Sequence, residues 1–343
     1  MRHLNSINDP VYTEKPLSRF GQFVLHYIRD KRDIPFVILC LQIAVTIIPI
    51  TIALFFVEGT AWYVLAALFL VLEVYFMGPF ILMLHNTSHN PFFKQQYQLG
   101  NRVIPWGLCP FMGQSPDTYF SHHIGMHHAE NNLELDKSST MPYQRDSLID
   151  FLKYFFRFLL VGIFDLFGYL RMKNKDKFLR RAIIGEVTFM VVCAILLWFD
   201  WQTTLLVFVA PLVIVRFFMM AGNWAQHAFV DPSAPQNNYL NSITCINSVY
   251  NKRCWNDGYH IGHHLKPHLH WTEMPKDFLA NADKYAENKA LVFEKVDYNE
   301  IWAMLMFKRY DRLADYLVNI NGMYPSKEAA IRVMQQRTKK FEV

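Results

Sequence analysis

Ten of the fourteen histidines in this 343-residue chain lie in four short clusters. Each cluster contains two side chains able to bind a metal at a spacing of four residues: His85/His89, His123/His127, Asn223/His227 and His260/His264. On a helix, this spacing puts both side chains on one face, so each pair is expected to point at one spot. His263 lies three residues after His260, and all three imidazoles of "HIGHH" are therefore expected to converge. This concentration of imidazole predicts metal binding.

The number of ligands predicts two metal ions. A structural zinc takes four protein ligands and a catalytic zinc takes three, and imidazole also suits iron and copper. We expect His122 to be a neighbour that binds no metal. The remaining candidates are nine histidines and one asparagine: His85, His89, His123, His127, His128, Asn223, His227, His260, His263 and His264. Two ions with four or five ligands each account for this set.

Other kinds of site fit the sequence less well. A helical zinc protease carries H-E-x-x-H with glutamate as the general base, but Asn86 follows His85 here. The sequence contains no Ser-His-Asp elbow, phosphate-binding loop or haem-attachment motif. Its five cysteines form no C-x-x-C pair, so we expect reduced thiols and no iron–sulfur centre. The net charge of +5 is modest and does not indicate nucleic acid as a partner.

Three carboxylates close to the clusters are candidates for orienting the ligands. A ligating imidazole commonly donates its other ring N–H to a carboxylate. Glu130, Asp136 and Asp257 lie near enough in the sequence to do this, and a solvated loop position is the alternative for each. His268 and His270 follow the last cluster, and we expect them to support the site or the structure without binding metal.

Four apolar runs are long enough to hold these clusters at a membrane surface. A helix needs about 20 apolar residues to span a bilayer, and such runs occur at 34–57, 60–84, 182–199 and 203–222. His85 follows the second run, and Asn223 follows the fourth. We therefore expect the ends of two spans to position two of the clusters.

The distribution of Lys and Arg predicts the orientation of the spans. The first 33 residues contain six of them, residues 85–181 contain twelve, and the chain after 222 contains fifteen. The two short connections between paired spans contain none. The positive-inside rule therefore places both termini and all four histidine clusters in the cytoplasm, with the spans forming two hairpins.

The stretch at 151–170 resembles a fifth span but contains Lys153, Arg157 and Asp165. We expect it to be a helix that lies in the membrane interface. The predicted fold is thus an all-α integral membrane protein, with four spans, an interfacial helix and a cytosolic helical cap that carries the clusters. We divide it into a cytosolic segment at 1–33, a membrane domain at 34–272 and a cytosolic helical segment at 273–343.

Glu73 and Arg216 are ionisable residues inside predicted spans, as is Glu186. Glu73 lies about 18 Å along the helix from His85 and is either a proton carrier, a polar stop in a substrate tunnel, or a neutral group hydrogen-bonded to another span. Arg216 lies near the cytoplasmic end of its span and is expected to snorkel towards the surface, where a headgroup or carboxylate contact is an alternative.

The clusters H-x3-H, H-x3-H-H and H-x2-H-H, interleaved with two membrane hairpins, resemble the membrane fatty acid desaturase and hydroxylase superfamily over about residues 60–272. Asn223-x3-His227 is similar to the additional ligand segment of its stearoyl-type members. The resemblance implies two irons held by the ten candidate residues, O2 as co-substrate and a lipid acyl substrate. It also implies an external electron donor of the ferredoxin or cytochrome b5 type, since no such domain is recognisable in this sequence.

The resemblance makes fatty acid desaturation the expected reaction. The second cluster departs from the usual H-x2-H-H of acyl desaturases, because three residues separate His123 from His127, as is commoner in hydroxylase branches. Acyl or alkane-type hydroxylation and fatty acid decarboxylation are therefore alternatives within the superfamily. A membrane di-zinc hydrolase and a metal-binding scaffold without activity are alternatives from other classes.

Overall fold

The computed structural model describes residues 1–341, and these are mostly helical. The only strands among them are β1 (Thr244–Ile246) and β2 (Val292–Glu294), which pair in parallel. The chain divides into two compact units, each built from segments that are distant in the sequence. Unit 1 contains Met1–Tyr12, Met126–Tyr169 and Phe217–Val343, and unit 2 contains Thr13–Gly125 and Leu170–Arg216.

Four helical stretches are long and apolar enough to cross a membrane, as the sequence predicts: Lys31–Leu54, Gly59–His89, Asp176–Phe199 and Trp201–Gln226. The first three contain α2 (Ile34–Leu54), α3 (Gly59–His89) and α7 (Asp176–Phe199). The fourth contains α8 (Trp201–Thr204), η6 (Leu205–Val209) and α9 (Ala210–Gln226). Large apolar side chains such as Val45, Val71 and Ile195 are exposed on these helices, as expected for surfaces that face lipid.

The stretch at 151–170 lies in α6 (Leu148–Met172), which is not among these four. This agrees with the expectation of four spans. The charges of α6 pair along the helix, Lys153 with Asp150 and Arg157 with Asp165. Its place in the membrane interface stays a prediction, as do the hairpin arrangement and orientation of the spans.

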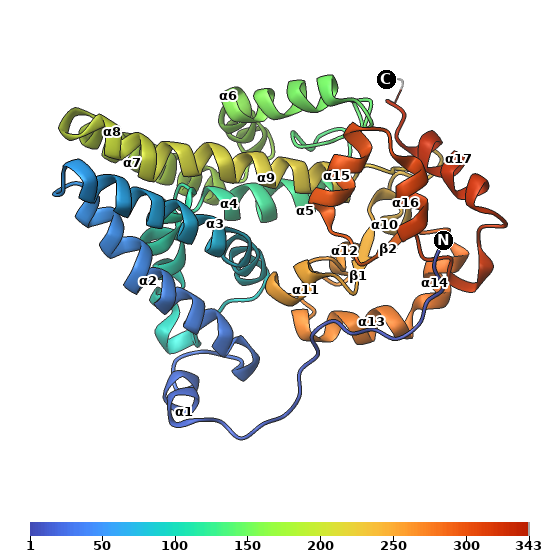
Figure 1. Cartoon of the computed structure of the whole chain (residues 1–343), viewed down its shortest axis with the longest axis horizontal. Helices are drawn as coiled ribbons and strands as arrows, with labels where there is room; N and C mark the ends of the chain where they lie inside the picture. Colours follow the sequence, from blue (N-terminus) through green and yellow to red (C-terminus); the bar gives the residue numbers. More distant parts are fainter. Residues whose placement is uncertain (342–343) are drawn as a thin grey trace. The chain divides into compact units, whose positions relative to one another are not determined.

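In unit 2, α2 packs along α3 (Figure 1). The buried side chains of α2 recur at the spacing of one helix face, at Phe36, Leu39, Ile43 and Ile47. α3 has 31 residues, which corresponds to about 46 Å. The apolar core of a bilayer is about 30 Å thick, so α3 is long enough to carry the first histidine cluster beyond it.

A buried loop at 113–117 leads to the second histidine cluster. The turns η2 (Gln95–Arg102), η3 (Ile104–Leu108) and η4 (Cys109–Met112) precede it, and α4 (Thr118–His122) follows it. Gly113 has a φ of 66°, and a Cβ atom there would lie 2.5 Å from the Pro211 carbonyl oxygen. A Cβ atom on Gly185 of α7 would lie 1.7 Å from the Pro116 oxygen. Because these two residues have no side chain, the apolar helices of unit 2 can pack directly against the backbone of this loop. This packing fixes the position at which α4 starts.

The structure decides between the expectations for Arg216 and removes one of those for Glu73. Arg216 makes the carboxylate contact that was its alternative to snorkelling, because its guanidinium lies 3.5 Å from the carboxylate of Glu186, which also accepts a hydrogen bond from Ser115. Glu73 is only 2% exposed, and neither of its carboxylate oxygens has a hydrogen-bond partner among the described residues. The hydrogen bond to another span, which was one expectation for Glu73, is therefore not formed.

Unit 1 surrounds the β1–β2 pair with short helices. These are α5 (His128–Glu130), most of α6, α10 (Asn238–Asn241), α11 (Val249–Arg253), α12 (His260–Leu265), α13 (Met274–Ala280), α14 (Ala282–Glu287), α15 (Tyr298–Met306), α16 (Tyr310–Tyr316) and α17 (Lys327–Arg337). Phe151 of α6 packs against Trp224 of α9 and Trp302 of α15. All five cysteines of the chain are free thiols, as predicted.

Candidate metal centre

Four imidazoles of unit 1 converge on one spot. They belong to His127, His227, His260 and His264, and each offers a nitrogen that lies within 4.8 Å of the other three. The Nε2 atom of His260 lies 3.2 Å from that of His227 and 3.0 Å from that of His264. Nitrogens bound to one tetrahedral ion at ordinary Zn–N lengths are about 3.3 Å apart. The spacing therefore fits a shared metal ion.

Three elements supply this four-histidine group. His127 ends the π-helical turn η5 (His123–His127), and His227 follows the last turn of α9. His260 and His264 lie one turn apart on α12 and so share a face, as their spacing predicts. The adjacent residues His263 and His264 are about 100° apart around a helix. Both cannot point at the same spot, and the expectation that all three imidazoles of "HIGHH" converge is wrong.

The outer nitrogens of two of these imidazoles are fixed by hydrogen bonds. Nδ1 of His127 donates to Oδ2 of Asp136 at 2.8 Å, as expected for one of the three candidate carboxylates. The other Asp136 oxygen accepts from the backbone N–H and the hydroxyl of Ser138. Nδ1 of His227 lies 3.0 Å from the carbonyl oxygen of Asn241. These bonds leave Nε2 of both imidazoles available for a metal.

Burial keeps two of the four imidazoles uncharged. Burial, reinforced by the neighbouring His127, lowers the pKa of His227 to about 4. Burial and the surrounding histidines lower the pKa of His264 well below its usual value. Both imidazoles are therefore neutral near pH 7, which is the form that binds a metal.

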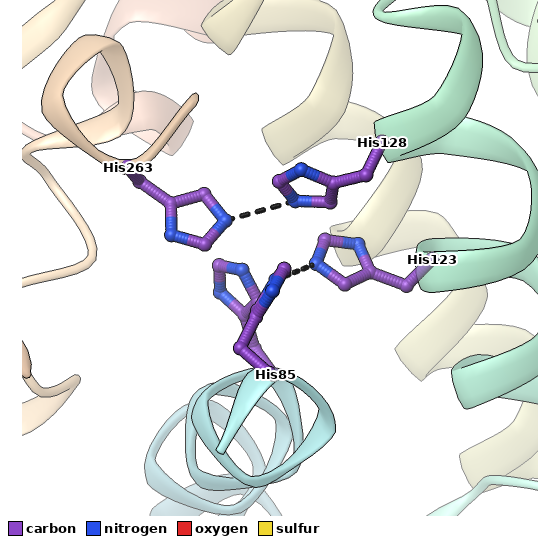
Figure 2. A group of neighbouring side chains, drawn as sticks. His85, His123, His128 and His263 are labelled. Atoms are coloured by element: carbon purple, nitrogen blue, oxygen red, sulfur yellow. Dashed lines mark hydrogen bonds between the residues drawn. The ribbon is translucent and has the colours of Figure 1, made fainter. Parts of the chain in front are cut away.

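A separate pair of histidines in unit 1 lies on other faces of α5 and α12. Nε2 of His263 is 2.9 Å from Nε2 of His128, which Figure 2 marks with a dashed line. The ring of His128 also stacks on that of His264, with centroids 4.9 Å apart. α12 thus contributes to two histidine sets, with His260 and His264 in one and His263 in the other.

Three histidines come together in unit 2. His85 and His89 lie in the last turns of α3, and His123 begins η5. Nε2 of His89 is 2.9 Å from Nε2 of His123, and the ring centroids of His85 and His123 are 4.5 Å apart. Figure 2 shows His85 and His123 next to each other. The prediction that His123 and His127 point at one spot is wrong, because His123 joins this set and His127 joins the four-histidine group.

The family model described as fatty acid desaturase matches residues 60–295, more than half of the chain and a range that includes every candidate ligand. The chain belongs to the fatty acid desaturase family. No curated protein and no solved structure gives a match. Family membership makes the chain an oxidoreductase of desaturase type, and its four apolar helices make it a membrane protein. The resemblance seen in the histidine clusters is thereby confirmed.

The remaining candidates of this family member have other partners. Asn223 donates its side-chain N–H groups to the Ser138 carbonyl and the Tyr154 hydroxyl, so only its Oδ1 is suited to face a metal. His122 belongs to neither histidine group that is able to hold a metal. Glu130 accepts a hydrogen bond from Tyr169, and Asp257 accepts one from Tyr250. His270 caps the turn η7 (Trp271–Glu273), which is a structural role, as expected.

Asn241 and Tyr154 were not predicted from the sequence. Neither lies in a motif: Asn241 contacts His227, 14 residues away in the sequence, and Tyr154 contacts Asn223, 69 residues away. Helix spacing predicts which candidate ligands share a face. It does not predict which other residues form hydrogen bonds with the side-chain atom that points away from the metal site. No signal in a single sequence identifies such contacts.

Unit 2 also contains a cavity of about 420 Å³ beside its three histidines. Leu84, Thr87 and Ser88 of α3 line it, and so does Tyr119, whose ring stacks on His123 with centroids 5.3 Å apart. Its basic lining residues are Arg29, Lys177 and Arg181, and its only acid among the described residues is Asp117, which pairs with Arg181. The cavity therefore carries a net positive charge.

Proposed function

We propose that this chain is a di-iron desaturase that introduces a double bond into a lipid acyl chain. The four-histidine group carries the proposal, because four imidazoles around one spot suit a redox metal in a family of lipid oxidases. In the net reaction, two adjacent carbons lose one hydrogen atom each. These two hydrogens, together with two electrons and two protons from outside, reduce O2 to two molecules of water.

We propose the ten residues of the histidine clusters as the iron ligands. One iron would be held by His127, His227, His260 and His264. The proposed ligands of the second iron are His85, His89, His123, His128 and His263, and Asn223 would contribute Oδ1 directly or through water. Bound iron supplies the activation of O2 towards an unreactive C–H bond. The protein orients the imidazoles, as Asp136 does for His127 and Asn241 does for His227.

The cavity in unit 2 is the proposed site for the polar end of the substrate. Its basic side chains suit a carboxylate or phosphate, and one of its lining residues, Tyr119, stacks on His123 of unit 2. We therefore propose an acyl substrate with an anionic head.

We propose that both termini and the histidine clusters face the cytoplasm, where an external ferredoxin or cytochrome b5 would deliver the electrons. The asymmetry of Lys and Arg supports this orientation. A soluble donor has to approach from the side on which the clusters lie.

The three residues between His123 and His127 favour a second reaction of the same superfamily. Hydroxylation would leave an oxygen atom on the chain, and decarboxylation would shorten it to a terminal alkene. A di-zinc hydrolase would need neither O2 nor electrons. The products and the bound metal distinguish these reactions.

The test is mass spectrometry of fatty acids and hydrocarbons from a host that expresses the chain, compared with the same host expressing His263→Ala. A new double bond that disappears in the variant supports desaturation. A hydroxylated or shortened product would replace desaturation by one of the two related reactions. A silent profile together with about two zinc ions per purified chain would overturn the proposal in favour of the hydrolase.

A further inference from the structure

The first twelve residues of the chain fold with unit 1, and we call them the strap (Met1–Tyr12). Figure 1 shows the strap running beside α13 and α14. Arg2 pairs with Glu294 at 3.1 Å, and its backbone N–H donates to the Leu317 carbonyl. Leu4 and Ile7 pack on a core cluster that includes Tyr259. The strap is therefore bound to unit 1 along its length.

Asp9 is the buried anchor of the strap, with 4% of its surface exposed. Its Oδ2 atom accepts three hydrogen bonds. The donors are the Tyr259 hydroxyl at 2.6 Å, the Asn247 backbone N–H at 2.7 Å and the Asn251 side chain at 3.0 Å. Tyr259 immediately precedes His260, so one carboxylate oxygen holds the N-cap residue of α12.

The segment from Asn247 to Tyr259 is held in an unusual conformation. Asn247, Trp255 and Asn256 have φ values of 54°, 56° and 55°. Left-handed conformations at residues other than glycine cost of the order of 1 kcal/mol each and persist only where the surroundings enforce them. Asn256 is held by the strap as well, because its side chain donates to the Pro10 carbonyl at 2.7 Å.

Hydrogen bonds of Asn251 also hold the segment that leads into α12. Oδ1 of Asn251 accepts from the Gly258 backbone N–H at 2.9 Å, and its Nδ2 donates to the Cys245 carbonyl. A Cβ atom on Gly258 would lie 2.3 Å from each of these two oxygens. α12 itself has no side-chain hydrogen bond at its N-cap. Its start is thus fixed by the contacts of Tyr259 and the preceding segment, not by its own cap.

We infer that Asp9 is a positioning residue for the metal centre. Through Tyr259 it sets the rotation of α12, and this rotation decides that His260 and His264 face the four-histidine group while His263 faces His128. The inference rests on the proposed role of these histidines as ligands. It assigns to the strap a part in building a site that is some 250 residues away in the sequence.

The experiment is a Co²⁺ titration of purified, metal-free full-length protein, followed by the ligand-field absorption of the bound ion. Wild type is compared with Asp9→Ala, with Asp9→Asn, which keeps an acceptor oxygen, and with Tyr259→Phe, which loses only the hydroxyl. Asn8→Ala is the matched control, because the exposed Asn8 contacts Asn247 only through its backbone. We expect Asp9→Ala and Tyr259→Phe to bind Co²⁺ about tenfold or more weakly with an altered spectrum, and Asp9→Asn to restore most of the wild-type spectrum.

Wild-type spectra and affinities in both Asp9→Ala and Tyr259→Phe would overturn the inference. If Asp9→Ala does not fold, Tyr259→Phe decides, and a thermal unfolding curve like that of wild type confirms that it is folded. Failure of the proposed function has a different signature, in which wild type binds no Co²⁺ or binds it without any oxidation of lipid in the expression test. A weakened variant beside a competent wild type supports the inference.

Discussion

Replacing Asp136 by asparagine tests how the four-histidine group is oriented. The Asp136 carboxylate is buried and accepts from four donors: Nδ1 of His127, the backbone N–H of Asn132, and the backbone N–H and hydroxyl of Ser138. Asparagine offers one acceptor oxygen, so its NH2 group must face either the His127 and Asn132 donors or those of Ser138. In the first orientation, His127 loses the partner that holds its tautomer.

The expected magnitude follows from these contacts. A hydrogen bond to a charged group contributes about 1.5–3 kcal/mol, and loss of such an outer partner commonly weakens metal binding about 10–100-fold. We therefore expect Asp136→Asn to lower iron affinity by about this factor. The assay is competition between the purified protein and a chelator of known affinity, with iron measured by elemental analysis.

Asp165→Asn is the matched control, since it removes a carboxylate that pairs with Arg157 on the outside of α6. The control should keep the iron affinity of wild type. Iron affinity in Asp136→Asn equal to that of the control would refute the argument that this hydrogen bond orients a ligand.

Three further predictions follow from the site and its surroundings. Because the pKa of His227 is lowered to about 4 in the folded protein, protons bind more readily to the unfolded chain below about pH 6.5. The free energy of unfolding of the metal-free form should therefore be highest above about pH 6.5 and decrease by about 3 kcal/mol as the pH falls to 4. A melting temperature that stays constant over this range would contradict this prediction. Gly185→Ala should destabilise the protein by at least about 3 kcal/mol, whereas Gly168→Ala, whose added methyl meets nothing within 4 Å, should melt like wild type. Lys177→Ala should raise KM for an acyl substrate with an anionic head several-fold and leave kcat unchanged, because Lys177 lines the cavity. An equal rise in KM for the exposed control Lys173→Ala would argue against the cavity as the binding site of the head.

The features predicted correctly from the sequence depend on local patterns. Apolar runs identified all four spans, and the interval of four residues placed His260 and His264 together. Asp136 was a correct candidate because it follows the second cluster closely and ligating imidazoles need an acceptor.

The errors arose where distant segments meet. Spacing places His123 and His127 near one helix face, but the neighbouring elements decide which histidine set each one joins. A carboxylate contact of Arg216 was one of two expectations, but its partner Glu186 depends on how two apolar helices pack, which hydropathy does not report. Asp9 lies in a polar stretch without a motif, and only the folded chain brings it to Tyr259.

The position of three histidines on one short helix has a consequence for how the metals are acquired. α12 has six residues and directs His260 and His264 to one set and His263 to the other. An ion held by His260 and His264 would restrain the remaining motion of α12, so that fixing His263 would cost a second ion less entropy. Metal uptake should therefore be cooperative, with chains that hold a single ion rare at every stage of loading.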